Sequence, residues 1–253
     1  MAFNFLMFSS IFGLFALMMV FHKKLGEYPE PLPKVENRKR EIWQIVVTYI
    51  IYMISLSYVI FGVFRNDLYY PAIPLGSFDL NYHLILVIVM PIIVEIVINK
   101  RRPKDMGLRK SWNPVPGIVC ILFGVLWGAI PAFMGGTEPL TPFEVIYYLI
   151  TPAFSEEWFY RGFIQQKLER VTSQTKSWII GGLLFGALHI PTDFFGPIWY
   201  NNGQSIFNST ISLINQILTG CIWGILFIKT RNLLPCIASH YFINFMPGLI
   251  ALV

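Results

Sequence analysis

Long apolar runs, separated by short polar segments, make up most of the chain. A helix needs about 20 predominantly apolar residues to cross the hydrocarbon core of a bilayer, so the pattern predicts an all-α, polytopic membrane protein with about eight transmembrane helices. We expect these spans at residues 3–21, 42–64, 78–98, 115–134, 142–166, 177–195, 205–228 and 233–252. The sequence has no internal repeat, no low-complexity tract and no sign of a second domain, so residues 1–253 are expected to form a single integral membrane domain.

The composition agrees with this prediction. Of the 253 residues, 55% are hydrophobic and only 13% are charged, which is about half the charged share of a typical soluble domain. Disorder requires high charge and few apolar residues, so it is excluded, and a soluble globule of this size would need a larger polar coat. The net charge of +5 is spread over short blocks between the apolar runs, so we expect no nucleic-acid partner.

Basic residues are concentrated in every second loop. The segments 22–41, 99–114, 155–177 and 229–232 together hold 18 of the 19 lysines and arginines. The positive-inside rule places such segments in the cytoplasm. We therefore expect a multi-pass protein of the cell membrane with both termini outside.

Three polar groups interrupt the predicted spans. A charged residue at the bilayer centre costs about 2.5–3.5 kcal/mol on insertion scales, and such residues in a membrane protein usually mark functional sites. The groups are Glu156, Glu157 and Arg161 in the fifth span, His189 in the sixth, and His240 and Asn244 in the eighth. Phe185 precedes His189 by four residues.

Helical spacing separates the roles of the two glutamates. Glu157 and Arg161 are four residues apart and can form an ion pair on one helix face. Glu156 lies about 100° away around the helix and has no basic residue three or four positions along. A carboxylate without a cationic partner is a candidate general base. We therefore expect Glu156 to take part in the chemistry and the Glu157–Arg161 pair to hold the helix in place.

The candidate residues reach similar depths from one face of the membrane. At about 1.5 Å per residue, Glu156 and His189 lie about 15 and 18 Å from the cytoplasmic ends of their spans. His240 and Asn244 lie about 10 and 16 Å from the corresponding end of theirs. One internal polar cavity, open towards the cytoplasm, could hold all four. Pro152, just before the glutamates, is expected to kink its helix, which is tolerated where backbone lines a cavity.

A carboxylate, two imidazoles and an amide are suited to hydrolysis. Glu156 and His189 could hold and deprotonate a water, while His240 and its i+4 neighbour Asn244 could donate to the oxyanion of an amide. Alternatively, Glu156, His189 and His240 could bind Zn²⁺ with one position left open. The sequence has no H-E-x-x-H, so no metal is firmly predicted. A Cys236–His240 nucleophile is a third possibility, although a thiol in an apolar span is usually inert.

The three motifs together resemble those of a known family. Glu156-Glu157 with Arg161 reads EExxxR, Phe185 with His189 reads FxxxH, and His240 with Asn244 reads HxxxN. In this order, on late spans, they resemble the CPBP family, which comprises the type II CAAX prenyl endopeptidases and the bacteriocin-processing and immunity (Abi) proteins. The resemblance covers residues 150–245, and the first four spans agree with it only in length and hydropathy.

This resemblance implies an intramembrane endopeptidase that acts on a peptide or lipidated peptide, such as a prenylated CAAX sequence. Its mechanism is glutamate-type or metal-dependent, and we favour the metal-free, glutamate-type one. The catalytic residues it implies are Glu156, His189, His240 and Asn244, and the supporting residues are Glu157, Arg161 and Phe185. Two other functions stay open. One is a non-catalytic immunity or scaffold protein of the same fold. The other is a proton-coupled transporter, although no pseudo-symmetry between the two halves of the chain is evident.

Overall fold

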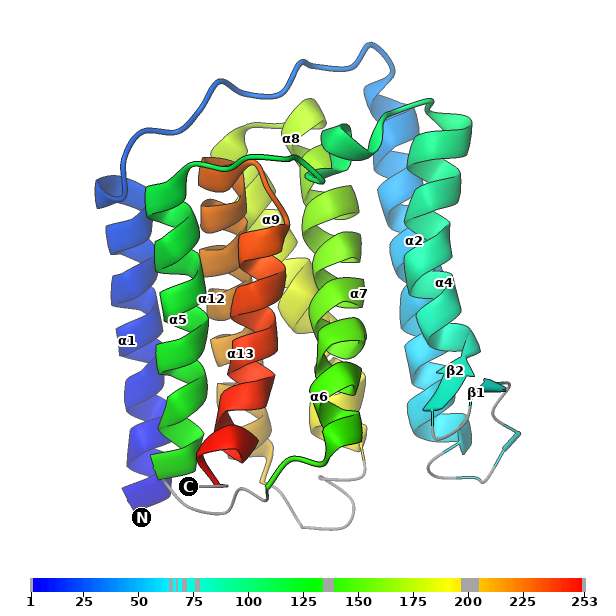
Figure 1. Cartoon of the computed structure of the whole chain (residues 1–253). Coiled ribbons are helices and arrows are strands. Elements are labelled where there is room, and N and C mark those ends of the chain that lie inside the picture. Colours follow the sequence, from blue (N-terminus) through cyan, green and yellow to red (C-terminus); the bar gives the residue numbers. More distant parts are fainter. Residues whose placement is uncertain are drawn as a thin grey trace. The chain divides into compact units, whose positions relative to one another are not determined.

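The computed structural model describes residues 2–63, 66, 68–69, 72–75, 78–133, 139–196 and 205–251. Residues 64, 134 and 252, at which three predicted spans end, lie outside the described part. Most described residues are helical (Figure 1). The contacts divide the chain into two compact units. Unit 1 contains Met1–Leu25, Glu30–Leu86 and Ile164–Ile225, and unit 2 contains Gly26–Pro29, Val87–Phe163 and Leu226–Val253.

The long apolar helices make this an integral membrane protein. Among the described residues, three helices are long and apolar enough to cross a bilayer: Arg38–Gly62, Gln174–Phe195 and Ile206–Thr230. Three shorter apolar helices are Tyr82–Ile98, Pro114–Ile130 and Leu234–Ile250. All six lie within predicted spans or overlap them, whereas the full number of eight stays a prediction.

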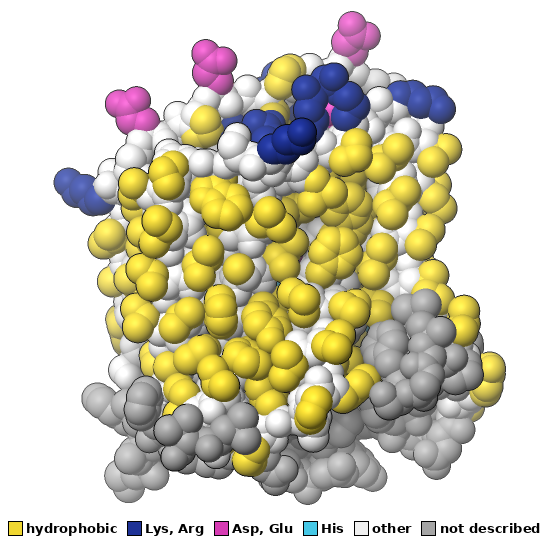
Figure 2. Space-filling view, in the orientation of Figure 1, with side chains coloured by type: hydrophobic (Ala, Val, Ile, Leu, Met, Phe, Trp, Pro, Cys, Tyr) yellow, Lys and Arg dark blue, Asp and Glu magenta, His cyan; other side chains and the backbone are white. Residues whose placement is uncertain are grey.

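The outer faces of these helices are apolar, as contact with lipid requires. On the helix that begins at Pro114, the side chains of Val115, Ile118, Leu122 and Leu126 are all exposed and follow one face. Exposed apolar side chains of this kind are yellow in Figure 2.

Unit 1 is built mainly from helices, with one small hairpin. Its helices are α1 (Ala2–Lys24), α2 (Arg38–Ser57), the π-helix η1 (Tyr58–Val63), α8 (Gln166–Val171), α9 (Gln174–Leu188), α10 (Ile190–Phe195) and most of α12 (Ile206–Thr230). In the hairpin, β1 (Ala72–Leu75) and β2 (Phe78–Asn81) are antiparallel, with Ala72 opposite Asn81 and Leu75 opposite Phe78.

The hairpin corrects one predicted boundary. The third span was expected to begin at residue 78, but Phe78–Asn81 is a strand and α4 (Tyr82–Pro91) begins four residues later. The sequence Phe-Asp-Leu-Asn alternates apolar and polar residues, which is the period of a strand. Because the apolar run that follows is long, the predicted span includes these four residues as well.

Unit 2 contains residues 87–91 of α4 and the elements not yet named. They are the π-helix η2 (Ile92–Ile98), the 3-10 helix η3 (Pro103–Met106), α5 (Pro114–Phe133), α6 (Pro142–Tyr148), the π-helix η4 (Leu149–Phe154), α7 (Ser155–Glu157), most of the π-helix η5 (Trp158–Gln165) and α13 (Leu234–Ile250). The predicted helix 142–166 is therefore a series of shorter segments. In this unit α5 and α13 lie side by side (Figure 1).

Two glycines on α5 allow α13 to approach closely. A Cβ on Gly124 would lie 2.2 Å from the backbone oxygen of Ser239, and one on Gly128 would lie 2.5 Å from the backbone oxygen of Phe242. Both distances are far below van der Waals contact, so only glycine fits. Glycines four residues apart commonly bring membrane helices together in this way. The contact fixes the part of α13 that carries His240.

A second pair of glycines serves α9 and α12 within unit 1. A Cβ on Gly182 would lie 2.3 Å from Sγ of Cys221, and one on Gly186 would lie 2.2 Å from Cγ1 of Ile217. Gly220 on α12 in turn faces Gly182. These close contacts hold the C-terminal end of α9, where His189 lies, against α12.

A buried ion pair joins α8 to α2 in unit 1. Lys167 on α8 has no exposed surface, and its Nζ lies 2.6 Å from Oε2 of Glu41 and 2.6 Å from Oε1 of Gln44, both on α2. A lysine buried in this way ties two helices of unit 1 together.

Replacing Gly124 by Leu should lower the melting temperature of the detergent-purified protein by several degrees. The reason is that inserting side-chain atoms into a packed contact costs about 1–3 kcal/mol, and here the obstacle is backbone. Gly13→Leu on α1 is the matched control, because a Cβ at Gly13 meets no atom within 4 Å. Equal melting temperatures for the two variants would contradict the close α5–α13 contact.

Candidate active site

A break in the helix precedes the two glutamates. Thr151 has φ −132° and ψ 111°, outside the helical region, and Pro152 follows it. Proline disfavours a helical conformation in the preceding residue and lacks an N–H group. The kink expected at Pro152 is confirmed. The helix restarts at Ser155, whose hydroxyl lies 3.5 Å from the Pro152 carbonyl, and continues into the wide π-helical turns of η5.

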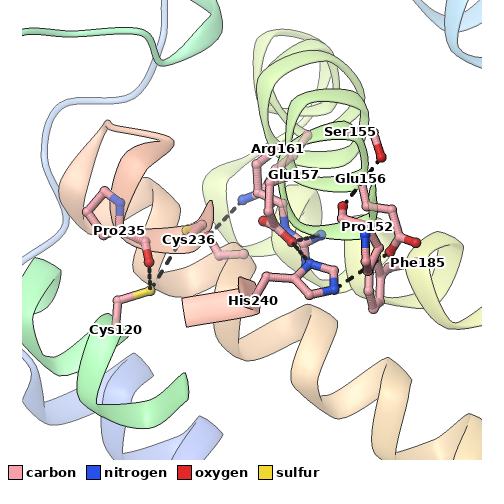
Figure 3. Close-up of polar contacts among 12 residues, drawn as sticks. Cys120, Pro152, Ser155, Glu156, Glu157, Arg161, Phe185, Pro235, Cys236 and His240 are labelled. Atoms are coloured by element: carbon pink, nitrogen blue, oxygen red, sulfur yellow. Dashed lines mark hydrogen bonds and ion pairs between the residues drawn. The ribbon is translucent and has the colours of Figure 1, made fainter. Parts of the chain in front are cut away.

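Glu157 is the most deeply buried residue of the site. Its side chain is 0% exposed. Oε1 lies 3.2 Å from Nη1 of Arg161, so the predicted ion pair is confirmed. The same oxygen lies 3.0 Å from Nδ1 of His240, on α13 (Figure 3). One carboxylate therefore joins the EExxxR and HxxxN motifs within unit 2.

This contact orients the imidazole of His240. An oxygen that faces a guanidinium is an ionised acceptor, so Nδ1 of His240 is the donor to Glu157. The other ring nitrogen, Nε2, then faces Oε2 of Glu156 at 4.0 Å. That distance is too long for a direct hydrogen bond.

Glu156 differs from Glu157 in its surroundings. Its side chain keeps 15% of its surface exposed, yet its Oε2 atom is buried and has no hydrogen-bond partner among the described residues. Thus the expected contrast between the two adjacent glutamates is present. Glu157 is paired on the inside, and Glu156 presents a carboxylate oxygen that is not occupied by a protein donor in the described part of the chain.

Asn244 lies one turn beyond His240 on α13. Its Nδ2 donates to the His240 carbonyl oxygen at 3.1 Å. The amide nitrogen carries two hydrogens, so this bond leaves one of them for another acceptor. The side chain is half-buried.

His189 and Phe185 belong to unit 1. The His189 N–H bonds the Gly186 carbonyl at 2.9 Å, because α9 ends here, and the His189 ring nitrogen Nδ1 lies 2.9 Å from the Phe185 carbonyl. A carbonyl can only accept, so Nδ1 carries the proton and Nε2 is left as the basic nitrogen. The Phe185 ring packs on the imidazole, with centroids 5.0 Å apart, and on Trp223. Phe185 therefore supports His189 through both its backbone and its ring.

The structure thus gathers Glu156, Glu157, Arg161, His240 and Asn244 in unit 2, and it places Phe185 and His189 together in unit 1. The common depth predicted for all the candidates stays a prediction. Two further polar residues of unit 1, Asp193 and Gln216, are not among the predicted site residues. Asp193 is at i+4 from His189, which is the spacing that revealed the Glu157–Arg161 pair, and Gln216 of α12 donates to it.

Cys236 is unsuited to act as a nucleophile. It is fully buried on α13, and its Sγ lies 3.9 Å from Sγ of Cys120 on α5 (Figure 3). Cys120 in turn lies 3.4 Å from the Pro235 carbonyl. A nucleophilic thiol needs access to substrate and a thiolate-stabilising environment, whereas these sulfurs pack between two helices.

No group of three histidine, cysteine or acidic side chains has a metal-binding arrangement in the part of the chain that the structure describes. Within unit 2, Glu156 and His240 supply two donors that face each other. The zinc site proposed from the sequence would need His189 as its third ligand.

The comparison with protein families bears directly on the motifs. Residues 138–246 match the model for Rce1-like type II CAAX prenyl endopeptidases. This part of the chain is similar to the Rce1-like endopeptidases. The matched region contains all three motifs, so the resemblance inferred from them is confirmed. The match supports a membrane hydrolase of the CAAX protease class in general. No curated protein and no solved structure gives a significant match to the chain.

Replacing Arg161 by Met should strongly destabilise the protein, because removing one partner of a buried ion pair costs about 3–5 kcal/mol. Thermal unfolding in detergent measures this. Adding Glu157→Gln in the same chain should recover part of the loss, since no unpaired charge is then left inside.

The control is Arg102→Met. Nε of Arg102 lies 3.7 Å from Oδ2 of Asp105, and the Arg102 side chain is 72% exposed. Exposed pairs contribute about 0–1 kcal/mol, so this variant should melt like the wild type. If Arg161→Met and Arg102→Met had equal effects, the structural role of the buried pair would be refuted.

Proposed function

We propose that the protein is an intramembrane endopeptidase that hydrolyses a peptide bond with a water activated by Glu156. The family match supports a CAAX-type endopeptidase in general. Beyond this general class, our proposal assigns the catalytic residues and the class of substrate.

The observation that carries this proposal is the setting of Glu156. Its Oε2 is buried, lacks a hydrogen-bond partner among the described residues and lies 4.0 Å from Nε2 of His240. A water bonded to Oε2 would lie beside Nε2 of His240, whose single hydrogen stays available for the substrate carbonyl oxygen. The water would then be held by a carboxylate that can take its proton.

In the first step, Glu156 accepts a proton from the water, and the resulting hydroxide attacks the carbonyl carbon of the scissile bond. His189 accepts the second proton of the water, which stays on the attacking oxygen until the tetrahedral intermediate collapses. Its Nδ1–H is held by the Phe185 carbonyl, so the free Nε2 is the nitrogen that takes a proton. The family pattern supports a role for both residues in one reaction.

The negative charge that develops on the carbonyl oxygen needs hydrogen-bond donors. We assign this role to His240 and Asn244. For Nε2 of His240 to donate while Nδ1 donates to Glu157, the ring must carry both protons. A protonated His240 balances the charge of the cluster, because Arg161 alone leaves one of the two carboxylates uncompensated.

Collapse of the tetrahedral intermediate breaks the C–N bond. The leaving nitrogen takes the proton that Glu156 received from the water, which restores the carboxylate. The products are a carboxylate and an amine, because His189 takes the remaining proton of the attacking oxygen and releases it to solvent. No covalent enzyme intermediate is needed.

The substrate proposed is a hydrophobic peptide at the membrane, with a prenylated CAAX sequence as the leading candidate. We also retain the predicted orientation, in which the basic segments lie on the cytoplasmic side, the proposed cavity opens there, and both termini lie outside.

A zinc-dependent reaction at Glu156, His189 and His240 is the alternative mechanism. Activity that a chelator removes and Zn²⁺ restores would favour it.

The variant Glu156→Gln should lower the cleavage rate at least about 100-fold, because loss of a general base typically costs 10²–10⁴. The assay uses purified protein and a fluorescence-quenched peptide with a farnesylated CAAX end, alongside the same peptide without the lipid, and mass spectrometry identifies the products. Glu36→Gln, a change at an exposed glutamate, is the matched control and should cleave normally.

Unchanged turnover by Glu156→Gln would sink the assigned role of Glu156. Absence of cleavage by the wild type, with either peptide, would favour the non-catalytic immunity or scaffold function instead.

Replacing Cys236 by Ala should leave the cleavage rate unchanged, because the thiol is buried against Cys120 and takes no part in the proposed reaction. Cys120→Ala removes the other sulfur of the same contact and serves as the packing control. If only Cys236→Ala abolished cleavage, and both variants kept the wild-type melting temperature, the glutamate mechanism would be wrong.

A further inference from the structure

Asp193 is an acidic residue in an apolar helix that none of the three motifs includes. It lies on α10, four residues beyond His189 and two beyond Pro191. The candidate membrane span Gln174–Phe195 contains it. A carboxylate in an apolar helix is costly unless it is hydrogen-bonded within the protein. Its presence there calls for partners and for a physical role.

The partners come from α12, in the same unit. Nε2 of Gln216 donates to Oδ2 of Asp193 at 3.0 Å and to Oγ of Ser212 at 3.2 Å. The Ser212 hydroxyl also bonds the Asp193 carboxylate. The backbone of Asp193 is held as well, because Oγ of Ser209 donates to its carbonyl at 2.7 Å. Asp193 is thus anchored to α12 through its side chain and its main chain.

Asp193 is equally connected to His189. Its N–H donates to the His189 carbonyl at 2.8 Å, and the Thr192 hydroxyl donates to the same oxygen at 2.9 Å. The carboxylate also lies within electrostatic range of the imidazole, without forming a direct ion pair. When Nε2 of His189 takes a proton, the ring becomes a cation, and a nearby negative charge stabilises it.

We propose that Asp193 is a positioning residue for His189. It holds the turn that follows His189 against α12, and its charge stabilises the imidazolium that forms when His189 accepts a proton. This inference rests on the proposed peptidase function and on the proton-accepting role of His189.

The charge and the anchoring can be separated experimentally. Asparagine has the size of aspartate, and its carbonyl oxygen can still accept from Gln216, so Asp193→Asn removes the charge and keeps most of the anchor. Ser209→Ala does the reverse, because it removes only a bond to the Asp193 main chain and leaves the carboxylate in place.

With the farnesylated CAAX peptide as probe, Asp193→Asn should lower kcat about 10- to 100-fold, which is typical when a carboxylate that supports a functional histidine is lost. KM and the melting temperature should stay near the wild-type values. Asp193→Glu, which restores the charge, should recover part of kcat. Ser209→Ala should lower the melting temperature and reduce kcat much less than Asp193→Asn does, because the carboxylate and its other contacts with α12 remain.

If Asp193→Asn does not fold, Gln216→Leu tests the same idea. It loosens the carboxylate without changing its charge, so kcat should fall while KM holds. Gln216→Leu with wild-type kcat would overturn the inference, as would Asp193→Asn with wild-type kcat. A loss of melting temperature in Asp193→Asn, with kcat per folded molecule unchanged, would show a purely structural role and also overturn it.

His189→Ala distinguishes failure of this inference from failure of the proposed function. If His189→Ala cleaves the peptide normally, the proton-accepting role assigned to His189 is wrong. If His189→Ala is inactive and Asp193→Asn is fully active, only the role of Asp193 is wrong.

Discussion

The burial of Glu157 is the constraint on which the candidate site depends. A carboxylate with no exposed surface in an apolar helix must be neutralised and hydrogen-bonded within the protein. Arg161 supplies a cation four residues along the chain, and His240 supplies a donor from α13. Both contact Oε1 of Glu157, so α13 cannot move away without leaving the Glu157 charge less well compensated. Nε2 of His240 is thereby directed at Glu156, so the contact that stabilises the buried Glu157 also positions the imidazole in the candidate site.

Close helix packing makes that geometry possible. The donors on α13 reach Glu157 only if the helices around them can approach, and Gly124 and Gly128 let the backbones of α5 and α13 come into contact. In unit 1, Gly182 and Gly186 do the same for α9 and α12. The hydrophobic effect does not drive helices together inside a bilayer, so close packing and a few polar contacts must stabilise their association. Each histidine motif therefore lies on a helix that is held by a pair of glycines four residues apart.

Local spacing accounts for what could be predicted from the sequence. The Glu157–Arg161 pair and the kink at Pro152 depend only on neighbouring residues, and both are present. The His240–Glu157 bond joins residues 83 positions apart, so it depends on packing that no local pattern contains. The strand at Phe78–Asn81 was missed because a long apolar run outweighed a short alternation. Asp193 was overlooked since it has no partner of opposite charge along its own helix, and its anchors come from α12.

The two histidines share a tautomer but face different acceptors. Each donates from Nδ1, His189 to a neutral carbonyl and His240 to a carboxylate. The Phe185 carbonyl fixes the His189 ring so that Nδ1 carries the hydrogen and Nε2 faces away from that bond. The Glu157 carboxylate fixes the His240 ring so that Nε2 faces Glu156 at 4.0 Å. In the mechanism we propose, the first ring takes a proton and the second stabilises an oxyanion. The residues that accept the Nδ1 hydrogen bonds orient both rings, so that proposal depends on them as much as on the histidines themselves.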